Sequence, residues 1–391
     1  MDFDLQWLLW SVPLAFALGW VASRWDFRQW RRDVTETPKV YYKGLNFLLN
    51  EQHDKAIDAF IEAVQQDPDT SDLHFALGNL FRRRGEHERA VRVHEYLLNR
   101  ADLPKAERER ARHELAQDFM KAGLLDRAEA AYQALAGTAF DTESRLALLS
   151  LHERSRAWQA AIGVARELEQ RGAGSFASRI SHFFCELAVE ADAAHQPDDA
   201  EAHLRDARAA APQAPRPLVL TGQRAAAAGE HERALRAWGA LLSAQSAWFN
   251  LVAHEYAASA EALGRAPAAL EQLAGAYRQN ASLELLDAIT RLDPDPASRR
   301  ARLIEHLRQH PTLAAALALL ASARDADREP ESPSSDAAAI QALRVALRRA
   351  ARPLHRYRCA ACGFEAEHYF WQCPGCLGWD TYPPRRLEDF R

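Results

Sequence analysis

Four cysteines near the C-terminus have the spacing of a metal site. They form two Cys-x-x-Cys pairs, Cys359 with Cys362 and Cys373 with Cys376, and ten residues separate the pairs. Each pair can fold into a tight knuckle that presents two thiolates to one ion. Two knuckles complete a tetrahedral, all-sulfur site that suits zinc or a single iron. The pattern predicts a small rubredoxin-like ribbon that holds one metal ion, with zinc expected and iron as the alternative.

The chemistry expected at this site is structural. Four protein ligands leave no open coordination position for water or substrate, so zinc would stabilise the fold and would not catalyse. A redox role requires iron, and the alternative function is a membrane scaffold that carries a rubredoxin-type electron-transfer centre. A pair of disulfides is disfavoured, because one tight cluster in 391 residues is not a disulfide scaffold. The fifth cysteine, Cys185, lies in a helical stretch and is expected to be a buried free thiol.

The N-terminal segment predicts a retained membrane anchor. The 19 residues from Leu5 to Ser23 carry no charge, and at 1.5 Å per residue such a helix reaches roughly 28 Å, about the thickness of a bilayer core. Asp2 and Asp4 precede the segment and several arginines follow it. The positive-inside rule therefore predicts that the rest of the chain faces the cytoplasm, where cysteines stay reduced. The acidic start disfavours a cleaved signal peptide, and the arginines disfavour a buried core helix.

The composition excludes some functions. The formal net charge is −5 at pH 7, so no global basic field attracts nucleic acid. The chain has 49 lysines and arginines, and the arginine excess is spread along it. We interpret these arginines as solvated helix faces and not as a phosphate-binding surface. A hydrophobic fraction of 48% is ample for a large core.

The middle of the chain is a repeat. Small residues recur at intervals of 33 to 39 residues, and a glycine often lies five positions before them. The alanines are Ala56, Ala90, Ala128, Ala161, Ala200, Ala234 and Ala269. The glycines are Gly85, Gly123, Gly229 and Gly264, and large side chains four positions after the alanines include Phe60, Tyr132, Leu204, Trp238 and Leu273. A period near 34 with this pattern is typical of the tetratricopeptide helix-turn-helix unit, so we expect an all-α solenoid.

The expected organisation has five parts. They are a transmembrane anchor at 1–23, a juxtamembrane linker at 24–36, tetratricopeptide repeats at 37–280, further helical repeats with a polar loop at 281–351, and the metal ribbon at 352–391. Solenoids display long concave surfaces that bind peptides or proteins, lined by the first helix of each unit. The residues expected on that surface are Phe75, Asn79, Arg82 and Arg83 in the second unit, and His113, Gln117, Met120 and Lys121 in the third.

No enzyme is predicted. The sequence contains no glycine-rich phosphate loop, no Gly-x-Ser-x-Gly elbow and no His-Glu-x-x-His motif. Its histidines fall mostly on helical positions without ligand spacing. The span would place the protein in the membrane and the repeats would bind partners, so the sequence favours a scaffold.

The chain resembles the lipopolysaccharide assembly protein B family (LapB, also called YciM) of Gram-negative bacteria. The resemblance lies in the order of span, repeats and ribbon, and in short sequence segments. These segments are His74–Leu80, Arg84–Glu86, Ala122–Leu124, His182–Phe183, Cys185–Ala188, Tyr357–Cys359 and Cys362–Phe364. One departure is Leu377, where a rubredoxin knuckle would have glycine after its last cysteine. This departure argues against a redox iron site and leaves a structural site possible.

The resemblance implies a regulatory adaptor in the inner membrane, with its repeats and ribbon in the cytoplasm. Members of this family work with the membrane protease FtsH to promote degradation of LpxC, the lipid A deacetylase. They thereby balance lipopolysaccharide against phospholipid synthesis. Further partners implied are other lipopolysaccharide assembly or sensing proteins of the inner membrane and the lipid bilayer, and a homo-oligomer is left open.

Overall fold

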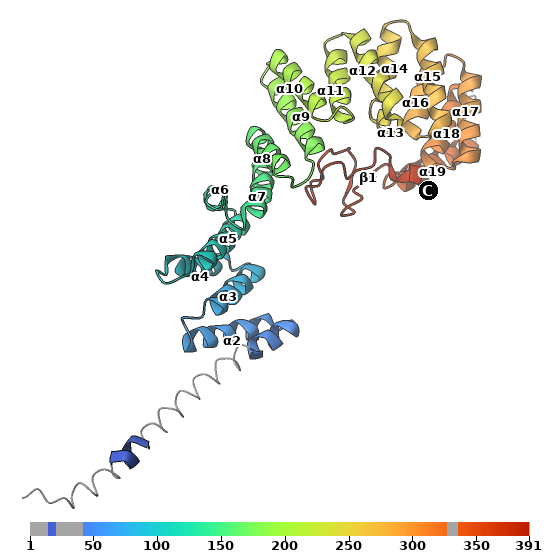
Figure 1. Cartoon of the computed structure of the whole chain (residues 1–391). Helices are drawn as coiled ribbons and strands as arrows, with labels where there is room; N and C mark the ends of the chain where they lie inside the picture. Colours follow the sequence, from blue (N-terminus) through green and yellow to red (C-terminus); the bar gives the residue numbers. More distant parts are fainter. Residues whose placement is uncertain (1–14, 21–41, 327–334, 391) are drawn as a thin grey trace, which may run out of the picture. The chain divides into compact units, whose positions relative to one another are not determined.

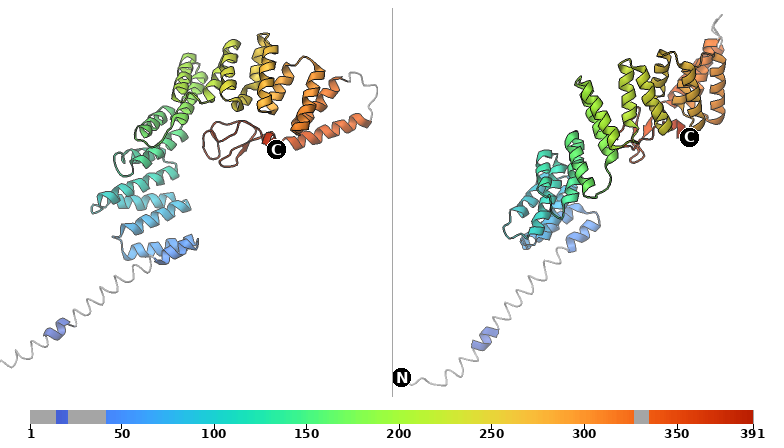
Figure 2. Two further views of the ribbon diagram at one scale, coloured as in Figure 1. Left: turned by 45° about the vertical axis from the view of Figure 1, so that its right-hand side comes forward. Right: turned by 45° about the horizontal axis from the view of Figure 1, so that its top comes forward.

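The computed structural model describes residues 15–20, 42–326 and 335–390, and these are helical except in the C-terminal ribbon (Figure 1). Helices that follow one another in the chain pack together as hairpin pairs (Figure 2). The chain divides into two compact units, Met1–Gly174 and Ser175–Arg391. The predicted all-α solenoid with a small terminal ribbon is confirmed for the part of the chain that is described.

The first unit is built from paired helices of similar length. A helical segment at 42–49 is followed by α2 (His53–Gln66), α3 (Ser71–Arg84), α4 (His87–Asn99), α5 (Lys105–Ala122), α6 (Leu125–Gln133), α7 (Asp141–Arg154) and α8 (Trp158–Gln170).

The second unit continues the same pattern and adds the ribbon. Its helices are α9 (Ala177–Ala193), α10 (Pro197–Ala210), α11 (Arg216–Ala227), α12 (His231–Ala244), α13 (Ser246–Phe249), η1 (Asn250–Val252), α14 (Ala253–Ala262), α15 (Ala266–Gln279), α16 (Leu283–Leu292), α17 (Pro296–Gln309), α18 (Leu313–Ala326) and α19 (Ser335–Ala351).

The repeating residues are buried where the helices meet. Each of the seven recurring alanines is at most 4% exposed, and the large side chains that follow them are equally buried. The four recurring glycines have φ angles between 65° and 84° and lie at the ends of first helices. That left-handed conformation satisfies the final carbonyls of a helix, and glycine adopts it without a Cβ penalty. The sequence pattern therefore marks the turn and the contact of each helix pair.

Arginines make contacts both within a repeat and between consecutive repeats. Within a repeat, Arg89 and Arg127 lie immediately before recurring alanines, and their guanidinium carbons lie 4.1 and 4.2 Å from the ring centroids of Phe81 and Phe119 on the preceding helix. Between repeats, four arginines form ion pairs with carboxylates about one repeat earlier. These pairs are Arg127–Glu95, Arg233–Glu201, Arg265–Glu232 and Arg291–Glu261. Part of the arginine excess is thus used between repeats, beyond simple solvation.

The ribbon begins directly after α19. Strands β1 (Tyr357–Arg358) and β2 (Glu365–Ala366) pair antiparallel, with Tyr357 opposite Ala366 and Arg358 opposite Glu365. An antiparallel bridge between Gln372 and Trp379 closes the turn that contains Cys373 and Cys376. Figure 2 shows the ribbon on the inner side of the arc formed by the helices of the second unit.

The predicted membrane anchor lies almost wholly outside the described residues. Of the segment from Leu5 to Ser23, only residues 15–20 are described, and they are helical. Among the described residues, no helix combines the length and apolar character that crossing a bilayer requires. The anchor therefore stays a prediction.

Candidate metal centre and the surfaces around it

The four predicted cysteine ligands converge on one point. Their sulfur atoms all lie within 4.8 Å of one another. The Sγ atoms of Cys359 and Cys376 are 3.8 Å apart, and those of Cys362 and Cys373 are 3.6 Å apart. Metal–sulfur bonds of ~2.3 Å in a tetrahedron give sulfur–sulfur edges of about 3.8 Å. The residues present therefore fit one tetrahedral metal ion.

The two knuckles have the same backbone hydrogen bonds. In the first, the N–H of Cys359 donates to the carbonyl of Phe364, and the N–H of Gly363 donates to the carbonyl of Cys359. In the second, the N–H of Cys373 donates to Gly378, and that of Leu377 donates to Cys373. Leu377 thus occupies the place that Gly363 has in the first knuckle. Both residues have positive φ, 77° for Gly363 and 59° for Leu377.

Hydrogen bonds within the knuckles favour the thiolate form of the first cysteine of each pair. Although burial opposes ionisation of Cys359, hydrogen bonds from Thr381 and from the backbone of Cys362 and Ala361 lower its pKa to about 6. Cys373 has a lowered pKa for the same kind of reason, since backbone groups of Cys376 and Gly375 outweigh its burial.

The second cysteine of each knuckle behaves in the opposite way. Cys362 and Cys376 have raised pKa values, because burial and the neighbouring cysteines outweigh a backbone hydrogen bond to each sulfur. All four sulfurs could be negatively charged this close together only with a positive ion between them. With all four ligands supplied by protein, such an ion would hold the ribbon together and leave no position for substrate.

The second knuckle fastens the ribbon to helix α9. The carboxylate of Asp380 accepts hydrogen bonds from Ser178 Oγ at 2.9 Å and from His182 Nε2 at 2.8 Å. The ring of His182 stacks on Trp379 with centroids 4.7 Å apart. Although burial opposes it, hydrogen bonds from His182 and Ser178 and the charge of Arg216 lower the pKa of Asp380. A residue four positions after the last cysteine thus anchors the metal site to the repeats.

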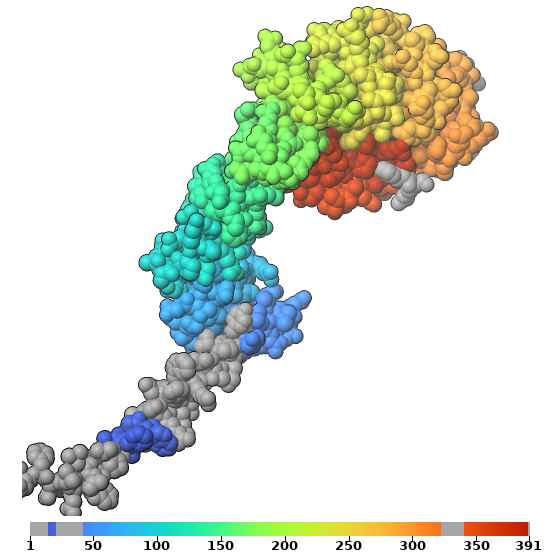
Figure 3. All heavy atoms as spheres, in the orientation of Figure 1, coloured from blue at the N-terminus to red at the C-terminus, as the bar shows by residue number. Residues whose placement is uncertain are grey.

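The ribbon and the segment that follows it make further contacts with helices of the second unit. Trp371 stacks on Trp248 of α13 with centroids 5.1 Å apart, and the guanidinium of Arg216 in α11 lies 5.7 Å from the Trp371 ring. At the far end, Glu388 accepts hydrogen bonds from the first N–H groups of α18, at Leu313 and Ala314. The space-filling view shows the ribbon against these helices (Figure 3).

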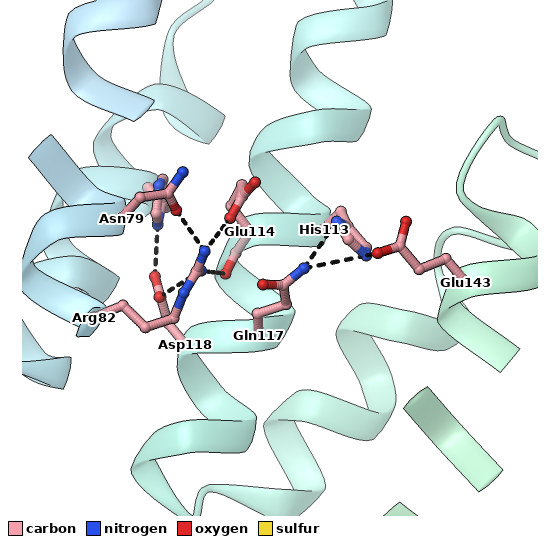
Figure 4. Close-up of polar contacts among 8 residues, drawn as sticks. Asn79, Arg82, His113, Glu114, Gln117, Asp118 and Glu143 are labelled. Atoms are coloured by element: carbon pink, nitrogen blue, oxygen red, sulfur yellow. Dashed lines mark hydrogen bonds and ion pairs between the residues drawn. The ribbon is translucent and has the colours of Figure 1, made fainter. Parts of the chain in front are cut away.

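Two of the residues predicted on α3, Asn79 and Arg82, belong to a polar network that joins α3 to α5 of the next repeat (Figure 4). Arg82 donates to Asp118 Oδ1 at 2.9 Å and to the backbone carbonyl of Glu114 at 3.0 Å, and it also contacts the side chains of Glu114 and Asn79. The Arg82 side chain is only 14% exposed and Asp118 is fully buried. Arg82 therefore connects two repeats and presents little of its charge to a partner.

A histidine completes this network. His94 Nδ1 lies 2.6 Å from Asp118 Oδ2, and both side chains are fully buried. Its ring lies against Gly78, where an added Cβ would approach to 2.5 Å. Glycine at position 78 therefore allows α4 to place His94 beside Asp118. Neither His94 nor Asp118 was predicted, because a single polar residue on a buried helix face has no local sequence signal.

The remaining predicted residues divide by exposure. Phe75 is 1% exposed and packs with Leu97, Leu103 and Ala111, and His113 is buried and stacks on Phe140 with centroids 4.7 Å apart. Gln117 is partly buried and lies within 3.5 Å of the His113 ring, whereas Glu143 of α7 approaches that ring from the next repeat (Figure 4). Asn79 and Met120 are partly buried, and Arg83 and Lys121 are exposed.

The prediction for Cys185 is confirmed. Its thiol is free and buried inside α9, and burial raises its pKa to about 12. It remains a neutral core residue and takes no part in the metal cluster.

Comparisons with known proteins agree with this arrangement. A family model described as a rubredoxin metal-binding domain matches residues 357–383. The chain is 32% identical to lipopolysaccharide assembly protein B of Escherichia coli (strain K12), over 98% of this chain and 99% of that protein. It is 25% identical to the protein of the same name from Haemophilus influenzae, over 95% of this chain and 96% of that protein.

Proposed function

Because the chain belongs to the lipopolysaccharide assembly protein B family, we propose that it is a membrane-anchored, cytoplasm-facing scaffold that regulates lipopolysaccharide biosynthesis. The observation that carries this proposal is the 32% identity over 98% of the chain, which includes both the repeats and the ribbon. A scaffold needs binding surfaces and no catalytic centre. The closed four-cysteine site and the helix-pair architecture are consistent with that role.

The finer proposal is that the protein is a proteolytic adaptor. It would bring the lipid A deacetylase LpxC to the membrane protease FtsH and so promote degradation of the deacetylase. Support comes from the proposed anchor: two proteins held at one membrane meet at a raised effective concentration without any new contact between them. Deleting residues 1–23 should leave folded repeats that no longer function at native expression levels.

The partner surface that we propose lies on α3 and α5 of the first unit. Arg83 and Lys121 are exposed there, and Asn79, Gln117 and Met120 are partly exposed beside them. The buried members of the predicted set, Phe75 and His113, and the paired Arg82 would hold this surface in shape. The exposed cations suit an acidic segment of a partner.

The test is the half-life of the deacetylase after translation is stopped, in cells with and without this protein. An adaptor shortens that half-life, so deletion should lengthen it several-fold. An unchanged half-life would remove the proteolytic role and leave a general scaffold in lipopolysaccharide assembly.

A pair of variants tests the surface separately. Arg83→Glu combined with Lys121→Glu should lengthen the half-life, because both charges are exposed on the proposed surface. Arg92→Glu on α4 is the matched control, since Arg92 is exposed on a second helix of the repeat. Equal half-lives for both variants and the unmodified protein would move the partner surface elsewhere.

A further inference from the structure

A cavity of about 280 Å³ lies in the second unit, away from the metal site. Its polar lining comes from α14, α16 and the segments that flank the ribbon, and its apolar wall comes from α16, α17 and α18. The polar residues are His254, Glu284, Asp287, Thr290, His355 and Arg386. A single water needs only about 10–15 Å³ of such space. The cavity is therefore large enough for a small organic group.

Glu284 is the buried acid of this cavity. The residue is 8% exposed, and Arg386 Nε lies 2.9 Å from its Oε1 atom. That approach lacks the geometry of a hydrogen bond, and Oε2 also has no hydrogen-bond partner among the described residues. Buried polar atoms are nearly always satisfied, so an unsatisfied carboxylate beside a cavity indicates a missing donor.

The surroundings of Glu284 disfavour its charged form. Burial and the nearby carboxylate of Asp389 raise the pKa of Glu284 to about 7 and outweigh the opposing effects of Arg386 and His254. Asp389 Oδ2 and Glu388 Oε2 are also buried without a hydrogen-bond partner among the residues described. Arg386 is shared, since its Nη1 lies 2.9 Å from His355 Nδ1. A cation in the cavity would favour the charged form of Glu284.

The shape and the donor set point to an organic cation. The apolar lining of the cavity includes Ala314, Ala318, Leu286 and Leu303, which suit methylene groups. Within the described part of the chain, the four cysteines are the only group of three or more side chains close enough to hold a metal ion. A metal at Glu284 would therefore lack ligands, whereas an ammonium or guanidinium group needs only hydrogen-bond acceptors.

We propose that this cavity binds a primary ammonium or guanidinium group on a short alkyl chain, with Glu284 as its anionic partner. The charged group donates to the free oxygen of Glu284, and the alkyl chain lies along the alanines of α18. Two sources carry this chemistry, a free diamine or agmatine-like amine and a lysine or arginine side chain of a protein. The proposal does not rest on the function proposed above.

Isothermal titration calorimetry on the metal-loaded full chain tests the site. The probes are cadaverine and agmatine as free amines, N-acetyl-lysine and N-acetyl-arginine methylamides as side-chain mimics, and 1-pentanol as an uncharged analogue. At least one charged probe should bind more than tenfold tighter than pentanol. Binding of the free amines alone identifies a small-molecule site, and binding of the methylamides identifies a site for a protein side chain.

Two variants locate the binding. Glu284→Gln removes the anion and Ala318→Leu fills the apolar wall, and each should weaken binding at least tenfold. Glu255→Gln is the control, because Glu255 is exposed on α14 and does not line the cavity. No binding of any charged probe, binding equal to that of pentanol, or unchanged affinity in the variants would overturn the proposal. If Glu284→Gln does not fold, the Ala318→Leu variant and the comparison with pentanol still test whether the cavity binds a cation.

Discussion

The two units use the same pair of side-chain types, histidine and aspartate, for different purposes. In the first unit, His94 and Asp118 lie 2.6 Å apart and connect one repeat to the next. In the second unit, His182 and Asp380 lie 2.8 Å apart although 198 residues separate them in the chain. A buried histidine paired with a carboxylate thus joins neighbouring repeats in one region and holds a distant ribbon in the other. The second arrangement depends on the metal knuckle, and the first does not.

Removing the metal should break the second arrangement and leave the first intact. Structural zinc supplies on the order of 10–16 kcal/mol to small peptide sites at neutral pH. Replacing Cys373 by serine should unfold the ribbon, release Asp380 from His182, and change the fluorescence of Trp371 and Trp379. Hydrogen exchange measures both regions at once. We expect lost protection in residues 357–390 and on α9, with α3 and α5 unchanged.

Cys185→Ala is the control for the loss of a thiol outside the cluster. Elemental analysis of the purified protein should find one metal ion per chain, with zinc expected. Iron with visible absorption would restore the electron-carrier alternative. An intact ribbon in the absence of any metal would contradict the structural role of the site.

Breaking the network of the first unit should have the next largest effect. Arg82→Ala leaves the carboxylate of Asp118 buried without its guanidinium partner, which costs about 3–5 kcal/mol. Hydrogen exchange should accelerate on α3, α4 and α5 while the ribbon keeps its protection. The neighbouring variant Arg83→Ala is the matched control, because an exposed residue should change stability by less than ~0.5 kcal/mol. Equal effects of the two variants would show that Arg82 does not hold the repeats together.

These two regions also show what the sequence can predict. The recurring alanines and glycines identify the helix pairs because each repeat needs a small residue at its contact and a left-handed turn. The four cysteines identify the metal site because their spacing is local. The helix register alone predicts Phe75 and His113 on the surface, yet both are buried, because residues of their own repeat and of the chain that follows it pack over them.

Contacts between distant parts could not be predicted in the same way. Nothing near His182 or Asp380 in the sequence indicates that they meet, since the contact depends on the path of the helices between them in the second unit. The role of Asp118 could not be predicted either, because its partners, Arg82 and His94, lie in the preceding repeat and are brought to it only by folding. The periodic pattern predicts helices and their pairing, whereas the polar contacts that join them depend on three-dimensional packing.

The next largest effect expected is a dependence of stability on pH in the second unit. Burial and Asp389 raise the pKa of Glu284 to about 7 from an ordinary value near 4.5. Between these values the folded state keeps a proton that the unfolded state has lost, so this group makes stability fall as pH rises from about 4.5 to about 7. The loss should be about 3 kcal/mol. Glu284→Gln should remove this fall from the unfolding transition of the second unit.

Thermal unfolding of the variant and the unmodified protein at several pH values measures the difference. The Glu284→Gln protein should gain stability relative to the unmodified protein as pH rises through this window. Asp389 has a raised pKa as well and interacts with Glu284, so the difference between the two proteins includes the change that the substitution makes to Asp389. Glu255→Gln serves as the exposed control. Parallel curves for Glu284→Gln and the unmodified protein would mean that Glu284 titrates normally.

The smallest expected effect compares the two knuckles themselves. Gly363 and Leu377 make the same hydrogen bond with positive φ, but only glycine adopts this conformation without steric cost. A left-handed non-glycine residue costs about 1–2 kcal/mol, and the Leu377 side chain is 45% exposed and recovers little by burial. Leu377→Gly should therefore stabilise the ribbon by up to ~1 kcal/mol, less than the full cost because glycine loses more entropy on folding. Gly363→Ala should destabilise it.

The rate of metal loss to a chelator measures both variants. Leu377→Gly should lose metal more slowly than the unmodified protein, and Gly363→Ala should lose it faster. Faster loss from Leu377→Gly would show that the leucine side chain contributes packing that outweighs its backbone strain. The two knuckles would then differ in how they are stabilised although their hydrogen bonds are the same, and the second knuckle, which carries Asp380, would depend on its side chains as well as on the metal.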